Sequence, residues 1–115
     1  MNTRDLILSS NDRKTQKVET PEWSCGHVYV RSLSAAERRK LTTTNAQATA
    51  AGNGHIVPGI VAAFIISDEA GTRIFTDDDA AALAEKNTHV LDRISEAYGK
   101  LNGLDPKEIR EAEKN

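Results

Sequence analysis

The most apolar stretch of the chain, IVPGIVAAFII at residues 56–66, constrains the fold most strongly because it has to be buried. Over so few residues, periodicity does not distinguish a buried strand from a buried helix. The β-branched residues favour a strand, whereas an alanine pair and Pro58 at a possible first helical turn favour a helix. The turn SDEAGTR and a short strand, RIF at 73–75, follow. We therefore expect a hairpin over residues 60–75, with a helix followed by a strand as the alternative.

Residues 17–33, KVETPEWSCGHVYVRSL, are typical of two strands joined by a turn. Gly26 supplies the backbone freedom of the turn, and Pro21, which lacks an N–H, places the first strand at an edge or at a bulge. The second strand has two unlike faces. Val28, Val30 and Ser32 alternate with Tyr29, Arg31 and Leu33.

Helix-start signals organise the next part of the chain. Ser34 and Glu37 have the spacing of a capping box, in which each side chain accepts the other residue's backbone N–H, so a helix is predicted from 35 to about 47. The alanine- and glycine-rich segment that follows predicts a flexible loop around 48–55. A shorter helix is predicted over residues 3–10.

Three consecutive aspartates, Asp77–Asp79, indicate either a divalent metal site or the start of a helix. Consecutive helical residues diverge by about 100°, whereas a hard metal ion needs oxygen ligands that converge on one point. Thr76 stands three residues before Asp79, which is a capping-box spacing, and AAALAEK behind it favours a helix. We therefore interpret the aspartates as a helix start, with no metal.

The last third of the chain predicts two more helices. One begins at Thr88, and Gly103 ends it in the left-handed conformation. The next begins with Asp105 as the cap and Pro106 in the first helical position. The fold expected for residues 1–115 is thus a single small α+β domain, with antiparallel β-hairpins packed with four to five helices. The apolar face of the helix from Thr88 comprises Val90, Leu91, Ile94, Ala97, Tyr98 and Leu101.

The composition argues against several function classes. The formal net charge is −2, so no basic excess attracts nucleic acid or an anionic membrane surface. The single cysteine, Cys25, excludes an internal disulfide and fits a reducing compartment. The longest apolar run near the start, Leu6-Ile7-Leu8, is too short for a signal peptide, and no run approaches the ~20 apolar residues of a membrane span. A soluble, cytoplasmic protein is expected.

Catalytic signatures are not found in the sequence. The histidines have no metal-ligand spacing to one another or to Cys25, and no phosphate-binding glycine motif is present. The basic patch ERRK at 37–40 is interpreted as a solvated helix face. Trp23, next to a turn, is either core or a partner contact, because tryptophan is enriched in interface hot spots. We therefore expect no enzyme activity, no metal and no cofactor.

The order of these segments resembles the small tail assembly chaperones of long-tailed bacteriophages and prophages. The resemblance extends over roughly residues 5–115 and is weakest across 42–58. The segments that carry it are VYVRSLSAAER, DEAGTRIFTDDDAAALAEKN and VLDRISEAYGKLNGL. The matching positions are Val28 to Arg31, Leu33, Ser34, Glu37, Arg38, Asp68, Glu69, Gly71, Arg73 to Phe75, Asp77, Asp79, Ala82, Leu83, Lys86, Leu91 and Leu101 to Leu104.

The resemblance implies a non-enzymatic protein of the host cytoplasm that binds the phage tape measure protein, keeps it soluble and is then displaced, so that it is not retained in the virion. The tail tube protein and a second copy of the chain are further candidate partners, and nucleic acid and membranes are not expected. The alternatives are a minor structural protein of the tail or its connector, and a nucleic-acid-binding regulator that uses the ERRK helix. The residues predicted to contact a partner are Trp23, Tyr29, Leu104 and Ile109.

The family resemblance also implies a longer product made by a ribosomal frameshift. The codons of Glu113-Lys114-Asn115 are compatible with a slippery heptamer, so the chain is hypothesised to be the short form.

Overall fold

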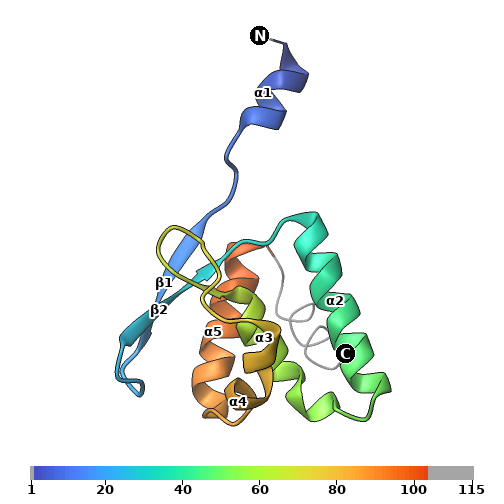
Figure 1. The fold of residues 1–115 in the computed structure, drawn as a ribbon. Helices are drawn as coiled ribbons and strands as arrows, with labels where there is room; N and C mark the ends of the chain where they lie inside the picture. The colour runs from blue at the N-terminus through green and yellow to red at the C-terminus, as the bar shows by residue number, and fades with distance from the viewer. Residues whose placement is uncertain (1, 104–115) are drawn as a thin grey trace.

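The computed structural model describes residues 2–103, within which the chain forms five α-helices and a three-stranded antiparallel sheet (Figure 1). The predicted α+β class is confirmed. The helix predicted from Asp105, together with Leu104 and Ile109, lies outside the described residues. The elements in chain order are α1 (Thr3–Ser9), β1 (Thr15–Thr20), β2 (Gly26–Arg31), α2 (Ala35–Ala50), a 3-10 helix (Gly54–Ile56), α3 (Val57–Ile65), β3 (Ile66–Ser67), a 3-10 helix (Asp77–Asp79), α4 (Ala80–Ala84) and α5 (Thr88–Leu101).

Strands β1 and β2 form the hairpin that the alternating pattern predicts. They pair antiparallel with Val18 opposite Val28, and both side chains are buried in the same core cluster as Val30. Gly26 begins β2 at a φ of 78°, a left-handed conformation that glycine adopts without steric cost. β1 is an edge strand that ends immediately before Pro21, which has no N–H to give to a sheet.

The apolar run folds as the alternative, a helix followed by a strand, and the preferred hairpin is wrong. α3 occupies Val57–Ile65, and β3 adds only two residues to the sheet. A helix satisfies its backbone hydrogen bonds internally, whereas a strand of that length needs a paired neighbour throughout. Pro58 lies in the first helical turn, where its missing N–H costs nothing. The strand predicted at 73–75 is reduced to one bridge between Arg73 and Ser67.

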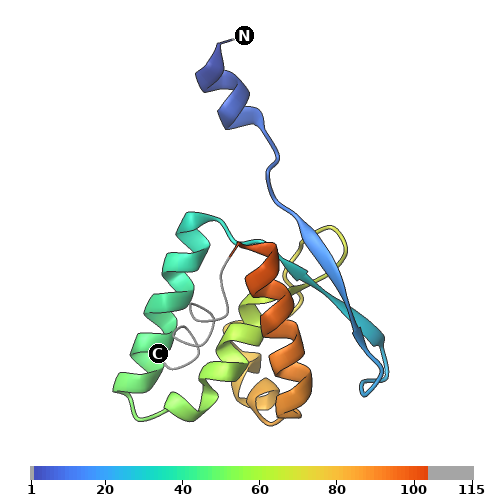
Figure 2. The ribbon, with the colours of Figure 1, turned by 180° about the vertical axis from the view of Figure 1, so that it is seen from behind.

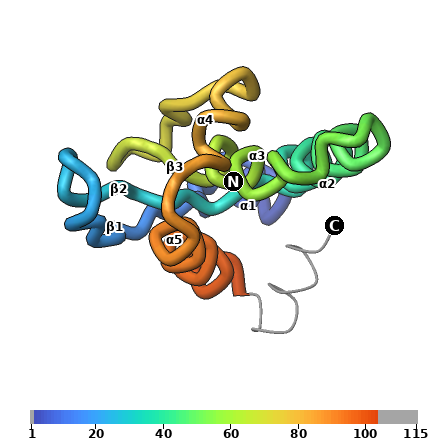
Figure 3. The backbone as a smooth tube through the Cα atoms, turned by 90° about the horizontal axis from the view of Figure 1, so that it is seen from below, coloured from blue at the N-terminus to red at the C-terminus, as the bar shows by residue number. Residues whose placement is uncertain are grey.

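Helix α3 is the centre of the core. Figure 3 shows α2, α4 and α5 arranged around it, and seven of its nine residues are buried. Gly59 marks the closest approach, because a Cβ atom added there would overlap the backbone carbonyl of Ala80 in α4. The packing of α3 on α4 therefore requires that residue 59 have no side chain. The largest fully buried side chains of the core are Phe64, Ile65, Ile66, Ile94, Val30, Val90 and Thr20.

Two arginines cap the C-terminal end of α3. The Nε of Arg31 donates a hydrogen bond to the carbonyl oxygen of Phe64 at 2.8 Å, and the Nε of Arg73 donates to that of Ala63 at 2.7 Å. Both oxygens belong to the last turn, where carbonyls have no partner within the helix. The guanidinium carbon of Arg73 also lies 4.2 Å from the centroid of the Phe64 ring, a cation–π contact. Both arginines are among the residues that carry the resemblance, and in this structure both stabilise the end of α3.

Helix α2 begins at the predicted capping box and ends later than predicted. The Ser34 hydroxyl accepts the N–H of Glu37 at 3.1 Å, and the Glu37 carboxylate accepts the N–H of Ser34 at 2.9 Å. The helix continues through Ala50, so the loop predicted around 48–55 is reduced to residues 51–53 before the next 3-10 turn. The last turn of α2 is rich in alanine, which favours a helix by its intrinsic propensity. It has no alternation of polar and apolar residues, so the sequence pattern did not indicate that the helix continues to Ala50.

The three aspartates begin a helix, as predicted. The Asp79 carboxylate accepts the backbone N–H of Thr76 at 2.9 Å, and the Asp77 carboxylate pairs with Arg73 at 2.7 Å. The run itself forms the 3-10 turn that leads into α4. Within residues 2–103, no three His, Cys, Asp or Glu side chains are grouped so that they would hold a metal ion.

Helix α5 begins at Thr88, as predicted, and is capped by Asn87, whose side-chain oxygen accepts the N–H of His89 at 2.8 Å. Gly103 follows the helix at a φ of 72°, the predicted left-handed conformation. The predicted apolar face packs into the core. Its buried members are Val90, Leu91, Ile94 and Tyr98, and Ala97 and Leu101 are partly buried.

Helix α1 stands apart from the rest of the molecule. Asn2 caps it by accepting the N–H of Asp5 at 2.9 Å, and none of its residues is buried. Figures 1 and 2 show from opposite sides that α1 points away from the other helices, beyond the start of β1. No helix in the described part of the chain, α1 included, combines the length and the apolar character needed to cross a membrane.

Candidate partner-binding surface

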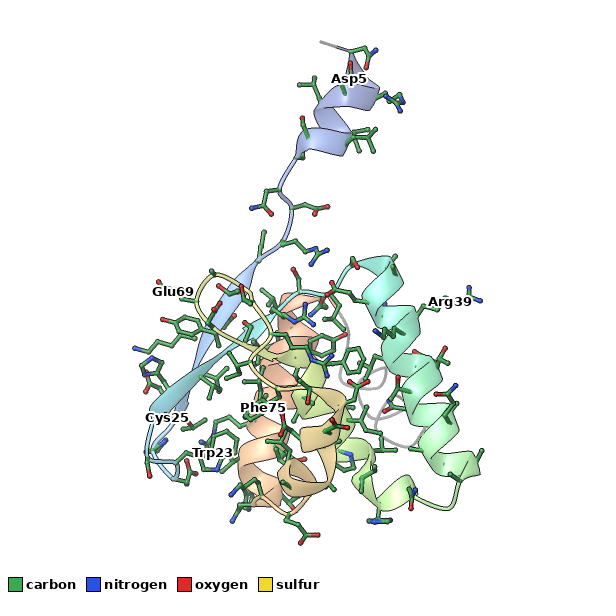
Figure 4. The ribbon with its side chains drawn as sticks, in the orientation of Figure 1. Asp5, Trp23, Cys25, Arg39, Glu69 and Phe75 are labelled. Carbon is green, nitrogen blue, oxygen red and sulfur yellow. The ribbon has the colours of Figure 1, made fainter. Side chains whose placement is uncertain are left out.

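The tip of the β1–β2 hairpin positions Trp23 beside α4. The N–H of Trp23 donates to the carbonyl oxygen of Thr20, and the N–H of Gly26 donates to that of Trp23, both at 3.0 Å. These hydrogen bonds fix a tight connection that brings the indole back toward the core. Figure 4 shows Trp23 and Phe75 near each other, between the hairpin tip and α4. Both side chains are partly buried against the core and partly open to solvent.

Trp23 and Phe75 line a pocket of about 430 Å³. Its apolar lining comes from the two aromatic rings and from α4, and its charged groups come from the hairpin tip, the helix start and the end of α4. The residues of this Trp23 pocket are Glu22, Trp23, Ser24, Phe75, Asp79, Ala82, Leu83 and Lys86.

The charges around the Trp23 pocket compensate one another. Both carboxylate oxygens of Glu22 accept hydrogen bonds from the guanidinium of Arg93, at 2.9 and 2.7 Å. This bidentate contact lowers the pKa of Glu22 to about 2 and raises the pKa of Arg93. Asp79 accepts the Thr76 N–H, and Lys86 adds a positive charge to the lining. With no strong net charge, the pocket suits an apolar side chain better than an ion.

Tyr29 lies on a different surface from Trp23. Successive residues of a strand point to opposite faces of the sheet, and the neighbours of Tyr29 in β2, Val28 and Val30, point into the core. The Tyr29 ring instead contacts His27 edge to face, with the ring centroids 5.7 Å apart. Tyr29 is half-buried and is not part of the Trp23 pocket. The structure therefore does not bring the two predicted aromatic contacts together.

The other residues of the pocket were not singled out from the sequence as partner contacts. Phe75 and Leu83 had been assigned to a strand and a helix, and nothing local indicated that they meet Trp23. Glu22 and Arg93 are 71 positions apart, so their pairing had no short-range signal. The one usable signal was the position of Phe75 directly before a helix start, where a side chain at the helix entrance packs on neighbouring elements.

Comparison of the chain with protein-family models, curated proteins and solved structures found no match. The observations that bear on function are thus the sequence motifs and the surface of the molecule.

Proposed function

We propose that the chain is a non-enzymatic tail assembly chaperone that binds the phage tape measure protein and keeps it soluble in the host cytoplasm until the tail tube forms. The proposal starts from the resemblance of its motifs to that family. It is supported by what the matching polar residues do in this fold, since Ser34 and Glu37 start α2, Arg31 and Arg73 end α3, and Asp79 caps the turn before α4.

The observation that carries the proposal is the Trp23 pocket. A tape measure protein is a long, helix-rich, apolar chain, and a chaperone for such a client needs an apolar contact that is repeated over many copies and weak in each one. A pocket with two aromatic rings and a charge-compensated rim accepts one large apolar side chain without demanding a particular sequence around it. Repetition along the client then supplies the avidity.

Co-expression tests this function. The chain is produced together with a phage tape measure protein, and the client's distribution between soluble and pelleted fractions is measured. The wild type is expected to hold most of the client in solution. Client that pellets equally with and without the chain would contradict the chaperone function.

A pair of aromatic substitutions locates the contact. Trp23→Ser is expected to release most of the client to the pellet, because truncating a central aromatic anchor costs about 2 kcal/mol or more of binding free energy. Tyr29→Ser, a matched control on the opposite face of the sheet, is expected to behave like the wild type. If Tyr29→Ser alone loses the client, the site is on the other face. Far-UV circular dichroism establishes that both variants fold.

The pocket also provides its own spectroscopic probe, because Trp23 is the only tryptophan in the chain. Titration with a client segment that lacks tryptophan is expected to shift the emission to shorter wavelength as the indole loses contact with water. Purified virions are expected to lack the chain, whereas a structural tail or connector protein would be found in them.

A further inference from the structure

Helix α2 buries few of its side chains. Of its 16 residues, only Leu41 and Asn45 are buried. The amide oxygen of Asn45 has no hydrogen-bond partner in the part of the chain that the structure describes. A buried acceptor without a donor destabilises a fold, so native structures normally supply one. The side of α2 that carries Asn45 is therefore expected to receive another segment.

A groove begins on that side of α2. Its volume is about 780 Å³. Three of its lining residues, Ala35, Arg38 and Thr42, follow one another along α2 at spacings of three and four, so they share one stripe of the helix. Asn45 is the next residue of that stripe, so the groove leads toward the unpartnered oxygen. The residues of this α2 groove used in the argument are Leu33, Ala35, Arg38, Arg39, Thr42 and Asn102.

The described part of the chain ends at the mouth of the α2 groove. The side-chain oxygen of Asn102 accepts the Leu33 N–H at 3.3 Å, and its nitrogen donates to the Tyr98 carbonyl oxygen at 2.8 Å, so the end of α5 is fixed beside the start of α2. Gly103 has a φ of 72°, the left-handed conformation that turns a chain out of a helix. Figures 1 and 2 show α2 and α5 extending from this junction toward the same end of the molecule. A chain that reverses direction here runs alongside α2.

The α2 groove combines apolar surface with positive charge. Leu33 and Ala35 supply apolar lining, and neither the Arg38 nor the Arg39 guanidinium forms a salt bridge within residues 2–103. The charge of Arg38 acts across the space between the helices, because it partly opposes the rise that burial causes in the pKa of Tyr98 on α5. The groove therefore suits a segment that carries carboxylates together with apolar side chains.

Residues 104–115 have this character. Their sequence, LDPKEIREAEKN, has two large apolar side chains, Leu104 and Ile109, and four carboxylates. In the helix that the sequence predicts for this segment, Glu108, Ile109 and Ala112 have the spacing of residues that share one face. That face presents an acid and two apolar side chains together.

The segment is also long enough to reach Asn45. As a helix, residues 106–115 span about 15 Å, at 1.5 Å per residue, and α2 covers the same length between Ala35 and Asn45. The side chains of Arg110 and Lys114 carry N–H donors that can satisfy the Asn45 oxygen.

We propose that residues 104–115 dock into the α2 groove of their own copy, with Ile109 against the apolar lining and Glu108 beside Arg38. The segment leaves the described chain at the groove itself, so the contact has the high effective concentration of an intramolecular one. Leu104 and Ile109 then belong to the fold and not to the client contact that the sequence suggested. The α2 groove shares no residue with the Trp23 pocket, so this proposal stands independently of the proposed function.

A spin label on the segment gives the first test. In a Cys25→Ser background the label is attached at Glu111→Cys, and the intensities of the backbone amide signals are compared before and after reduction of the label with ascorbate. The amides of Arg38 to Asn45 are expected to lose most of their intensity, whereas those of Trp23 at the hairpin tip are expected to keep it. Unchanged α2 amides, or equal losses at both places, would overturn the proposal.

A mixed sample identifies which copy is contacted. Spin-labelled chain without isotope label is mixed with isotope-labelled chain that carries no spin label. The α2 amides are expected to keep their intensity in this mixture. A loss as large as in the singly labelled sample would mean that the segment docks on a second copy, and the proposal would fail.

Hydrogen exchange measures what the segment contributes to α2. Ile109→Asp is expected to speed exchange of the α2 amides about tenfold or more, because α2 then opens locally more often. Ile74→Asp is the matched control, since Ile74 is an exposed isoleucine, at 55%, outside the α2 groove, and it is expected to leave exchange unchanged. Equal α2 exchange in both variants would overturn the proposal. So would loss of the client from solution with Ile109→Asp while α2 exchange stays at the wild-type rate, because Ile109 would then contact the client.

A charge exchange tests the pairing within the groove. Arg38→Glu and Glu108→Arg are each expected to speed α2 exchange by roughly two- to fivefold, the size of an exposed ion pair, and the double variant to restore it. If the double variant exchanges as fast as the single variants, the two residues do not meet and the proposed docking is wrong.

Discussion

Helices α1 and α3 are both short and both apolar at their centres, but they are stabilised in opposite ways. α1 has a side-chain cap from Asn2 and buries none of its seven residues. α3 has no side-chain cap at its start and buries seven of its nine residues. N-terminal capping and packing are therefore separate sources of helix stability, and α1 has the first without the second, whereas α3 has the second without the first.

The C-terminal ends of the two helices differ in the same way. The last carbonyls of α1 accept hydrogen bonds from residues close in sequence. For example, the Ser10 hydroxyl donates to the Leu6 carbonyl oxygen at 2.5 Å. The last carbonyls of α3 accept hydrogen bonds from the side chains of Arg31 and Arg73. Arg31 lies at the end of β2, and Arg73 follows the turn after β3. Changes in α3 are thus expected to affect the whole fold, whereas changes in α1 are expected to affect only what α1 contacts.

The largest effect is expected at the α3–α4 contact. Gly59→Ala places a methyl group against the Ala80 carbonyl and forces the two helices apart, which is expected to cost about 3 to 5 kcal/mol of the free energy of unfolding. Urea denaturation measures the cost. Gly54→Ala is the control, because its new methyl group meets only the Thr49 hydroxyl at 3.8 Å, and it is expected to change stability by less than about 1 kcal/mol. Equal stability of the two variants would refute the close contact.

The two arginines at the end of α3 are expected to differ in importance. Arg31→Met removes a buried guanidinium that serves Phe64 and pairs with Glu37 at 2.6 Å, and is expected to cost about 2 to 4 kcal/mol. Arg73→Met removes a more exposed group and is expected to cost about 1 to 2 kcal/mol. Thermal unfolding of both variants gives the comparison, and the reverse order would mean that burial does not decide the contribution.

The sequence predicted correctly those features that are determined by residues close together in the chain. The Ser34–Glu37 box, the aspartate helix start and the apolar face of α5 are all encoded within one or two turns, and all three were confirmed. The predicted hairpin over residues 60–75 was wrong. Residues 56–66 are almost all apolar, so they show neither the two-residue period of a strand nor the 3.6-residue period of a helix. The arrangement of its neighbours decided between helix and strand.

The candidate site was predictable only in part for the same reason. Trp23 was singled out because of its residue type, yet its partner Phe75 comes from a segment more than fifty positions away. Glu22 and Arg93 are also far apart, and each alone looks like an ordinary surface charge. Because the pocket is formed by three separate segments, no single segment contains a pattern that predicts it.

Acid is expected to weaken the junction that holds α2 and α3 together. Burial alone would raise the pKa of Glu37, but the Ser34 N–H and Arg31 outweigh it and hold the pKa at about 2, against 4.5 unperturbed. A lowered folded-state pKa stabilises the protein above pH 4.5, and this stabilisation is lost as the pH falls from 4.5 toward 2. Solvent screening of the partly exposed carboxylate limits it to about 1 to 2 kcal/mol.

Urea titrations across that pH range measure the slope. Glu37→Gln is expected to be less stable at pH 7 and to have a flatter profile below pH 4.5. Glu22→Gln is the comparison, because its pKa is lowered as far but the Glu22–Arg93 pair is exposed, so the slope is expected to change less. A steeper change with Glu22→Gln would place the acid-sensitive contact at the Trp23 pocket.

The smallest effect on stability is expected in α1. Replacing Leu6, Ile7 and Leu8 together by serine is expected to change the free energy of unfolding by less than about 0.5 kcal/mol, because these side chains lose no buried contact. Ile65→Ala in α3, by contrast, leaves a cavity at a fully buried position and is expected to cost about 2 to 5 kcal/mol. A large loss of stability would mean that α1 packs on the rest of the molecule, and the contrast between the two helices would fail.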